Sequence, residues 1–108
     1  MNDEFTRVAK VGQVREGDFY SVNLPDGTEI LLIKAQGQIF AVDIMCTHQS
    51  TWLDSGMVHP ATLEVECPLH EGKFDLRSGA VTHEPPEEPL QTYQVRIEGD
   101  DVLVGPPK

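Results

Sequence analysis

Short runs of alternating or uniformly apolar residues, separated by turn-forming residues, recur along the whole chain. Such runs predict β-strands over residues 6–10, 19–24, 28–35, 38–44, 62–66, 73–76, 91–97 and 102–104. Pro25-Asp26-Gly27 and Gln36-Gly37 have the composition of tight turns, because proline presets φ and glycine accepts positive φ. No window shows a sustained apolar stripe with a 3.6-residue period. The pattern therefore predicts an all-β fold, with room only for a helical turn near residues 51–54.

The pattern also predicts which strands are buried. Residues 28–35 are apolar on both faces, which is typical of a central strand. Residues 62–66 alternate and indicate a half-buried strand. In the run 91–97, the alternation directs Tyr93, Val95 and Ile97 towards the core.

Proline marks the segments that we expect to lie outside the strands. Residues 81–90 contain three prolines and three glutamates, which predicts a loop. Residues 105–108 contain Gly-Pro-Pro-Lys and are expected to form a tail. A length of 108 residues suits a single domain. Within it, residues from about 45 to 86 form an insertion between two sets of strands, which we interpret as a subdomain.

The net charge of the chain argues against some classes of binding partner. Eighteen acidic and eight basic residues give a formal net charge of −10. This charge argues against nucleic acid as a partner, because nucleic-acid binders need a basic face. It also argues against binding to anionic membranes. An acidic surface instead favours solubility and can steer the encounter with basic protein surfaces.

The N-terminus has neither a positive leader nor an apolar run, and the longest apolar stretch, residues 30–33, is too short to span a bilayer. We therefore expect a cytoplasmic protein. In that reducing compartment, the two cysteines are expected to bind metal or to stay as buried thiols rather than to form a disulfide.

The candidate chemistry lies in two Cys/His pairs, Cys46-Thr47-His48 and Cys67-Pro68-Leu69-His70, which hold every cysteine of the chain. Each pair follows a predicted strand, so the two loops can lie side by side at one end of a sheet. Thiolate and imidazole ligands suit iron–sulfur clusters or zinc. A disulfide, an unliganded core and a structural Cys2His2 zinc site are the alternatives. Zinc sites usually pair cysteine with cysteine and histidine with histidine, which counts against the last of these.

The motif Cys46-Thr47-His48, together with the run from Cys67 to Asp75, resembles the Rieske iron–sulfur motif. It has the form found in the small Rieske ferredoxins of multicomponent aromatic-ring dioxygenases, and the resemblance covers nearly the whole chain. The resemblance implies a Rieske fold, in which antiparallel sheets form a base sandwich with an inserted cluster-binding subdomain.

The resemblance also implies one [2Fe–2S] cluster. Cys46 and Cys67 would hold the inner iron, and His48 and His70 would hold the outer iron through Nδ1. A proline-containing third loop covers the cluster in this family, and residues 82–89, with Pro85 and Pro86, match that role.

By resemblance, the chain is an electron carrier and not an enzyme, so we expect no catalytic residues. It would accept electrons from an NAD(P)H-dependent ferredoxin reductase and pass them to a terminal oxygenase that acts on an aromatic hydrocarbon. We expect a monomer. Two alternatives remain: a Rieske small subunit of a reductase such as nitrite reductase, and a redox-inactive, zinc-binding interaction module.

The remaining conspicuous residues have weaker interpretations. His59 and His83 lack ligand spacing and are expected to be surface or turn histidines. Trp52 and Leu53 are expected to pack the first loop onto the core of the subdomain. The candidates for steering a docked partner are all acidic: Asp54, Glu71, Glu84, Glu87 and Glu88.

Overall fold

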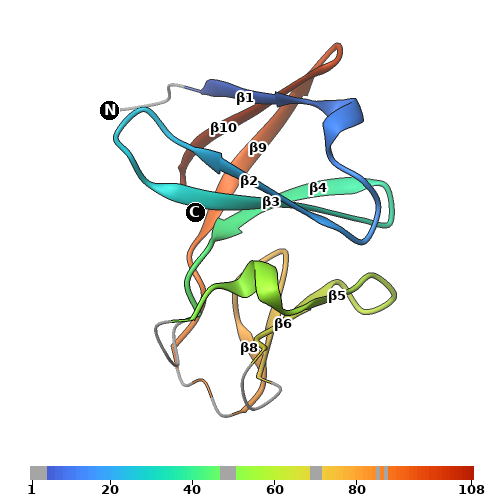
Figure 1. Ribbon diagram of the computed structural model, residues 1–108, viewed down its shortest axis with the longest axis vertical. Helices are drawn as coiled ribbons and strands as arrows, with labels where there is room; N and C mark the ends of the chain where they lie inside the picture. The colour runs from blue at the N-terminus through green and yellow to red at the C-terminus, as the bar shows by residue number, and fades with distance from the viewer. Residues whose placement is uncertain (1–4, 47–50, 69–71, 85, 87) are drawn as a thin grey trace.

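The computed structural model describes residues 5–46, 51–68, 72–84, 86 and 88–108. Within these residues it contains ten β-strands and two 3₁₀ helices, η1 (Val11–Gln13) and η2 (Leu53–Ser55) (Figure 1). Six strands form one sheet in the spatial order β1 (Thr6–Lys10), β10 (Asp101–Pro107), β9 (Thr92–Glu98), β4 (Gln38–Asp43), β3 (Glu29–Ala35) and β2 (Phe19–Asn23). The other four form a second sheet in the order β5 (Met57–His59), β6 (Glu64–Glu66), β7 (Lys73–Asp75) and β8 (Val81–His83).

All paired strands in both sheets are antiparallel, which confirms the predicted all-β architecture. The 3₁₀ turn η2 lies where a helical turn was expected. Neither helix in the described part of the chain is long and apolar enough to cross a membrane.

The second sheet contains two strands that the sequence pattern did not predict. β5 has only three residues, and β8 lies inside the proline-containing segment that was expected to be a loop. Three residues are too few to display a period of two, so pairing with a neighbour decides these strands rather than their own pattern.

Two predictions near the C-terminus were wrong. β10 continues to Pro107, although residues 105–108 were expected to form a tail. Ile97 was expected to point inward, but its side chain is 48% exposed. β9 pairs with β4 only through Thr92 and Tyr93, so its second half extends beyond that neighbour and loses cover.

β3 lies between two hydrophobic clusters, as expected for a central strand. Figure 1 shows β1, β9 and β10 on one side of β2–β4, and the four-stranded sheet on the other. Because side chains alternate along a strand, Ile30 and Leu32 pack into the cluster shared with β10, whereas Leu31 and Ile33 pack into the cluster shared with the second sheet. All four side chains are completely buried.

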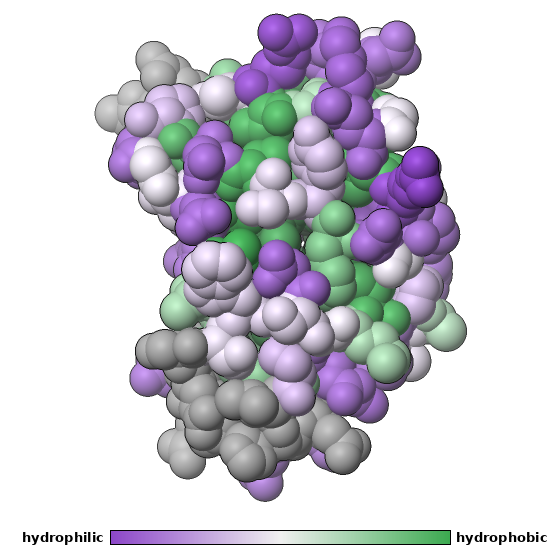
Figure 2. Space-filling model, in the orientation of Figure 1, coloured by the Kyte–Doolittle hydropathy of each residue, from purple (hydrophilic) through white to green (hydrophobic). Residues whose placement is uncertain are grey.

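The space-filling view adds the distribution of polar residues on one face (Figure 2). Hydrophobic residues, in green, lie along the middle of this face, and hydrophilic residues, in purple, border them above and on both sides. Hydrophobic residues are therefore partly visible at the surface, as is usual for a small domain with too little polar surface to cover its core.

A partly buried hydrogen bond joins the end of β4 to β9. The Tyr93 hydroxyl donates to Asp43 Oδ1 at 2.6 Å. Burial of the phenol, and then its hydrogen bond to the carboxylate, raise the pKa of Tyr93 above its usual value. The phenol therefore remains protonated and donating at neutral pH. This bond fixes β4 just before the chain enters the first Cys/His pair.

We expect Tyr93→Phe to lower the free energy of unfolding by about 1–3 kcal/mol, because the substitution leaves a partly buried carboxylate without its donor. Urea unfolding followed by far-UV circular dichroism would measure the change. Tyr20→Phe is the matched control, since the Tyr20 hydroxyl has no hydrogen-bond partner in the described part of the chain. Equal stabilities of the two variants would contradict this role for Tyr93.

Candidate metal centre

The first Cys/His pair is held at the base of a narrow hairpin that follows β4. The Leu53 amide donates to the Ile44 carbonyl at 2.7 Å, and the Cys46 amide donates to the Thr51 carbonyl at 2.9 Å. Between these bonds, Met45 and Trp52 form an antiparallel bridge. The strand geometry makes side chains alternate, so Ile44 and Cys46 point into the core and Met45 points outward.

The second pair follows the same rule at the hairpin between β6 and β7. The Cys67 amide donates to the Gly72 carbonyl at 2.7 Å. Cys67 directly follows the last residue of β6, and Gly72 directly precedes the first residue of β7. Val65 and Cys67 are buried, whereas Glu66 between them is only half-buried. Alternation along the strand therefore directs the Cys67 sulfur into the core.

The two loops thus share one construction. In each, the cysteine amide bonds to the carbonyl of the fifth residue after it, and the cysteine side chain is buried, 4% exposed for Cys46 and 1% for Cys67. Both side chains belong to the same hydrophobic cluster, and no disulfide joins them. The disulfide alternative is therefore wrong for this structure. The predicted ligands His48 and His70 lie outside the described residues.

A glycine brings the two hairpins together. The Gly56 amide donates to the Leu53 carbonyl at 2.8 Å and ends η2. A Cβ added at Gly56 would lie 1.9 Å from the carbonyl oxygen of Glu66, the residue immediately before Cys67. Only glycine permits this approach, so Gly56 sets how close the chain after the first hairpin comes to the second hairpin. Its spacing from Cys46 and Cys67 gave no signal of this role.

His59 has a partner that sequence reasoning missed. It was expected to be a surface or turn histidine, but it lies in β5 and its side chain is 30% exposed. Its Nε2 lies 2.6 Å from Glu66 Oε1, on the outward side of β6. This contact ties β5 to the residue before Cys67. His83 lies in β8 and is exposed, as expected of a surface histidine.

The proline-containing segment packs back onto the second sheet. Pro86 is completely buried, and Pro85 lies outside the described residues. The Leu90 amide donates to the Gly79 carbonyl at 2.7 Å, and the Leu90 side chain is buried in the cluster that contains both cysteines. Leu90, directly after the segment 82–89, thus packs against the subdomain.

Two carboxylates stabilise the strands around the second loop. Asp75 accepts hydrogen bonds from the Arg77 guanidinium at 2.8 Å and from the Arg77 amide at 2.7 Å. The guanidinium contact is the main reason that the pKa of Asp75 is lowered. Hydrogen bonds from the hydroxyls of Thr82 and Thr62 lower the pKa of Glu64. Both side chains therefore remain ionised at neutral pH and help to hold β6, β7 and the turn after β7.

The structure separates Trp52 from Leu53. Leu53 is completely buried in the cluster with the cysteines, which confirms its predicted role. Trp52 is 52% exposed, so the prediction that it packs onto the core was wrong. The register of the hairpin explains this exposure. Trp52 is bridged to Met45, which points outward, and directly bridged residues have their side chains on the same face.

These features suit a metal group with sulfur ligands. Two cysteine side chains from separate loops enter one apolar cluster, and a backbone hydrogen bond closes the base of each loop. Thiolates are soft ligands, and apolar surroundings limit the access of water to a bound group. The fold and the site define a small all-β protein with a candidate metal centre in two loops.

The chain belongs to the Rieske [2Fe-2S] domain family, whose model matches residues 4–94. It is 40% identical over 100 residues to the biphenyl dioxygenase ferredoxin subunit of Pseudomonas sp. (strain KKS102), covering 93% of this chain and 90% of that protein. It is 33% identical over 104 residues to the ferredoxin component of the naphthalene 1,2-dioxygenase system of Pseudomonas aeruginosa, covering 96% and 97% of the two chains.

A solved structure has the same fold. The ferredoxin of carbazole 1,9a-dioxygenase from Nocardioides aromaticivorans IC177 matches with a TM-score of 0.86 and 36% identity, over 94% of this chain and 97% of that chain. The predicted Rieske fold and the resemblance to dioxygenase ferredoxins are thereby confirmed.

We expect Gly56→Ala to separate the two hairpins and to reduce iron retention, because the added methyl group must displace the Glu66 carbonyl. Overpacking of this kind typically costs about 1–3 kcal/mol. Iron content per chain and thermal unfolding would measure both effects. Gly12→Ala is the matched control, since a Cβ there meets no atom within 4 Å. A Gly56→Ala protein with normal iron content and stability would contradict the role of Gly56 in holding the two hairpins close together.

Proposed function

We propose that this chain is an electron carrier that holds one Rieske-type [2Fe–2S] cluster and is not itself an enzyme. It accepts single electrons from an NAD(P)H-dependent ferredoxin reductase and passes them to a terminal aromatic-ring dioxygenase. The observation that carries the proposal is the pair of equivalent loops, each of which places a buried cysteine in the same apolar cluster. The relatives named as ferredoxin components of dioxygenase systems support it.

We assign Cys46 and Cys67 to one iron and His48 and His70 to the other. The buried position of both cysteines supports their assignment to the inner iron. When bound, a [2Fe–2S] cluster takes up and releases one electron, and its imidazole ligands raise the reduction potential above that of all-cysteine clusters. The surrounding residues of the chain exclude water from the sulfurs, and the closed loop bases fix where the sulfurs lie.

The proposal has consequences for organisation and partners. Residues 1–108 act as a single Rieske domain, in which the subdomain at about 45–86 carries the metal centre. The two sheets support this division, because the second sheet lies wholly within that segment. The reductase and the oxygenase bind to it in turn, and the chain works in the cytoplasm as a monomer. The net charge of −10 agrees with protein partners that present basic surfaces.

We expect alanine at Cys46, His48, Cys67 or His70 to abolish the brown colour and the iron content of the purified protein, because each substitution removes one of four ligands. Absorption spectra and iron and sulfide analysis would measure the loss, and EPR of the reduced protein would identify mixed His/Cys ligation. His83→Ala is the matched control, since His83 is an exposed histidine of β8 and lies outside the proposed ligand set. A colourless wild-type protein that contains zinc would support the zinc-binding alternative instead.

The carrier role is tested by reconstitution with the reductase and the terminal oxygenase from the same organism. We expect NAD(P)H oxidation coupled to dioxygenation of an aromatic hydrocarbon only when this protein is present, and no product without the oxygenase. Stopped-flow absorption after mixing the reduced protein with oxidised oxygenase would show the transfer directly, as re-oxidation of this protein's cluster and the return of its colour. A protein that holds the cluster but transfers electrons instead to a nitrite reductase would overturn the assigned partner.

A further inference from the structure

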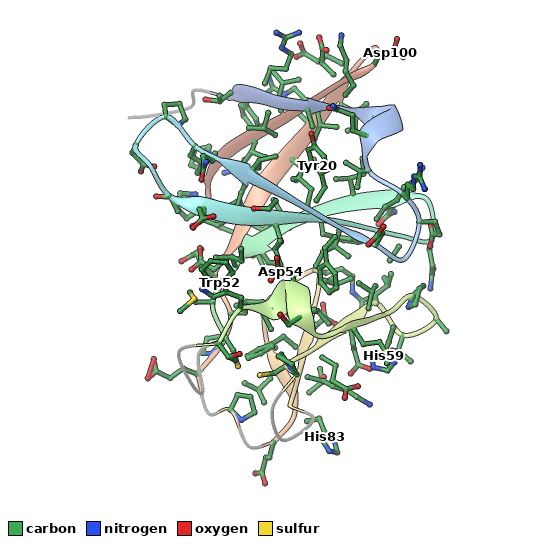
Figure 3. All side chains as sticks on the ribbon, in the orientation of Figure 1. Tyr20, Trp52, Asp54, His59, His83 and Asp100 are labelled. Carbon is green, nitrogen blue, oxygen red and sulfur yellow. The ribbon has the colours of Figure 1, made fainter. Side chains whose placement is uncertain are left out.

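Two large apolar side chains lie side by side on the outside of the first hairpin. Met45 and Trp52 form an antiparallel bridge, so their side chains share one face. Met45 is 38% exposed and Trp52 is 52% exposed. Figure 3 shows Trp52 at the side of the molecule, at the level where the six-stranded sheet meets the second sheet. Exposure of so much apolar indole surface to water is unfavourable. Neither the packing of the core nor the proposed metal ligation requires Trp52 to be exposed.

The pair borders a hollow with an acidic lining. The hollow has a volume of about 300 Å³, and Ile44, Met45 and Trp52 line it together with residues at the start of β3 and the end of β4. Those residues contribute the carboxylates of Glu29 and Asp43. No Lys, Arg or His is among the six described residues that line the hollow. The Asp43 carboxylate is held in place by Tyr93, so one of the negative charges is fixed.

The segment of the chain that contains Met45 and Trp52 is also acidic in sequence. Between Lys34 and Lys73 the chain has no lysine or arginine but has five acidic residues. One of them, Asp54, is exposed and lies two residues after Trp52 (Figure 3). A surface that combines an exposed aromatic side chain with carboxylates is complementary to an apolar pocket bordered by Lys or Arg side chains.

From these observations we infer that the Met45–Trp52 surface is a docking surface for the terminal oxygenase, which inserts the Trp52 indole into an apolar pocket bordered by basic residues. The inference rests on the proposed function, because it assigns to that partner a contact beside the metal loops. Trp52 follows Thr51, whose carbonyl closes the first loop at Cys46. A partner that covers Trp52 is therefore held next to the base of the first Cys/His loop.

Trp52 has the properties of an energetic anchor. Binding energy at protein interfaces is concentrated in a few residues, among which tryptophan is enriched, and the surrounding charged residues mainly govern association and specificity. We therefore expect the indole to contribute most of the affinity. Glu29 and Asp54 are expected to contribute mainly to the association rate and to its dependence on salt.

The test measures the equilibrium dissociation constant between the oxidised, cluster-loaded protein and the terminal oxygenase from the same organism. We expect Trp52→Ala to raise the Kd about tenfold, and Trp52→Phe, which keeps an aromatic ring, to raise it less. Glu29→Gln and Asp54→Asn should flatten the salt dependence of the association rate. Ile97→Ala is the matched control, since Ile97 is 48% exposed on β9 and lines a different hollow; it should leave the Kd unchanged.

Absorption and EPR spectra of each variant show whether the metal centre is intact, so a loss of binding can be assigned to the surface. A Trp52→Ala protein with wild-type affinity for the oxygenase would overturn the inference while leaving the carrier function standing, and so would an effect confined to the reductase. A wild-type protein that neither binds nor reduces the oxygenase would overturn the proposed function and the inference together.

Discussion

The candidate metal centre depends on two backbone hydrogen bonds, from the Cys46 amide to the Thr51 carbonyl and from the Cys67 amide to the Gly72 carbonyl. Each bond extends the pairing of a hairpin up to the cysteine itself, so the cysteine keeps strand geometry and its side chain must point to the core face. The sulfur positions are therefore set by backbone pairing. Gly56 then sets the separation of the hairpins, because its missing side chain lets η2 lie against the Glu66 carbonyl.

The surroundings of the sulfurs suit their proposed role. The cysteine side chains lie with Leu53, Val65 and Phe74 in one buried cluster. Among the described residues, no buried side-chain nitrogen or oxygen lacks a hydrogen-bond partner. An apolar shell lowers the local dielectric, so the net charge of a bound group has a larger effect on its electron affinity there than at the surface. The proposed neutral imidazole ligands would therefore change the electron affinity of a bound group more here than in water.

Much of this arrangement could be predicted from the sequence, and the exceptions have physical reasons. The Cys/His pairs and the longer strands carry strong local signals, so the fold and the candidate ligands follow from them. β5 and β8 are too short to show a period, and the closeness of Gly56 to Glu66 depends on tertiary packing alone. The exposure of Trp52 could have been found, because a buried Cys46 forces Met45 outward and the hairpin register then carries Trp52 with it.

The alternation along β3 has a consequence for how the molecule loses its structure. Successive residues of this strand enter different clusters, one shared with β10 and one shared with the cysteines. Melting either cluster therefore removes half the packing of a strand that the other cluster needs. The two halves of the molecule are then expected to fold and unfold cooperatively, as one thermodynamic unit. A substitution that destabilises the cysteine cluster is therefore expected to destabilise the cluster shared with β10 as well, and the reverse.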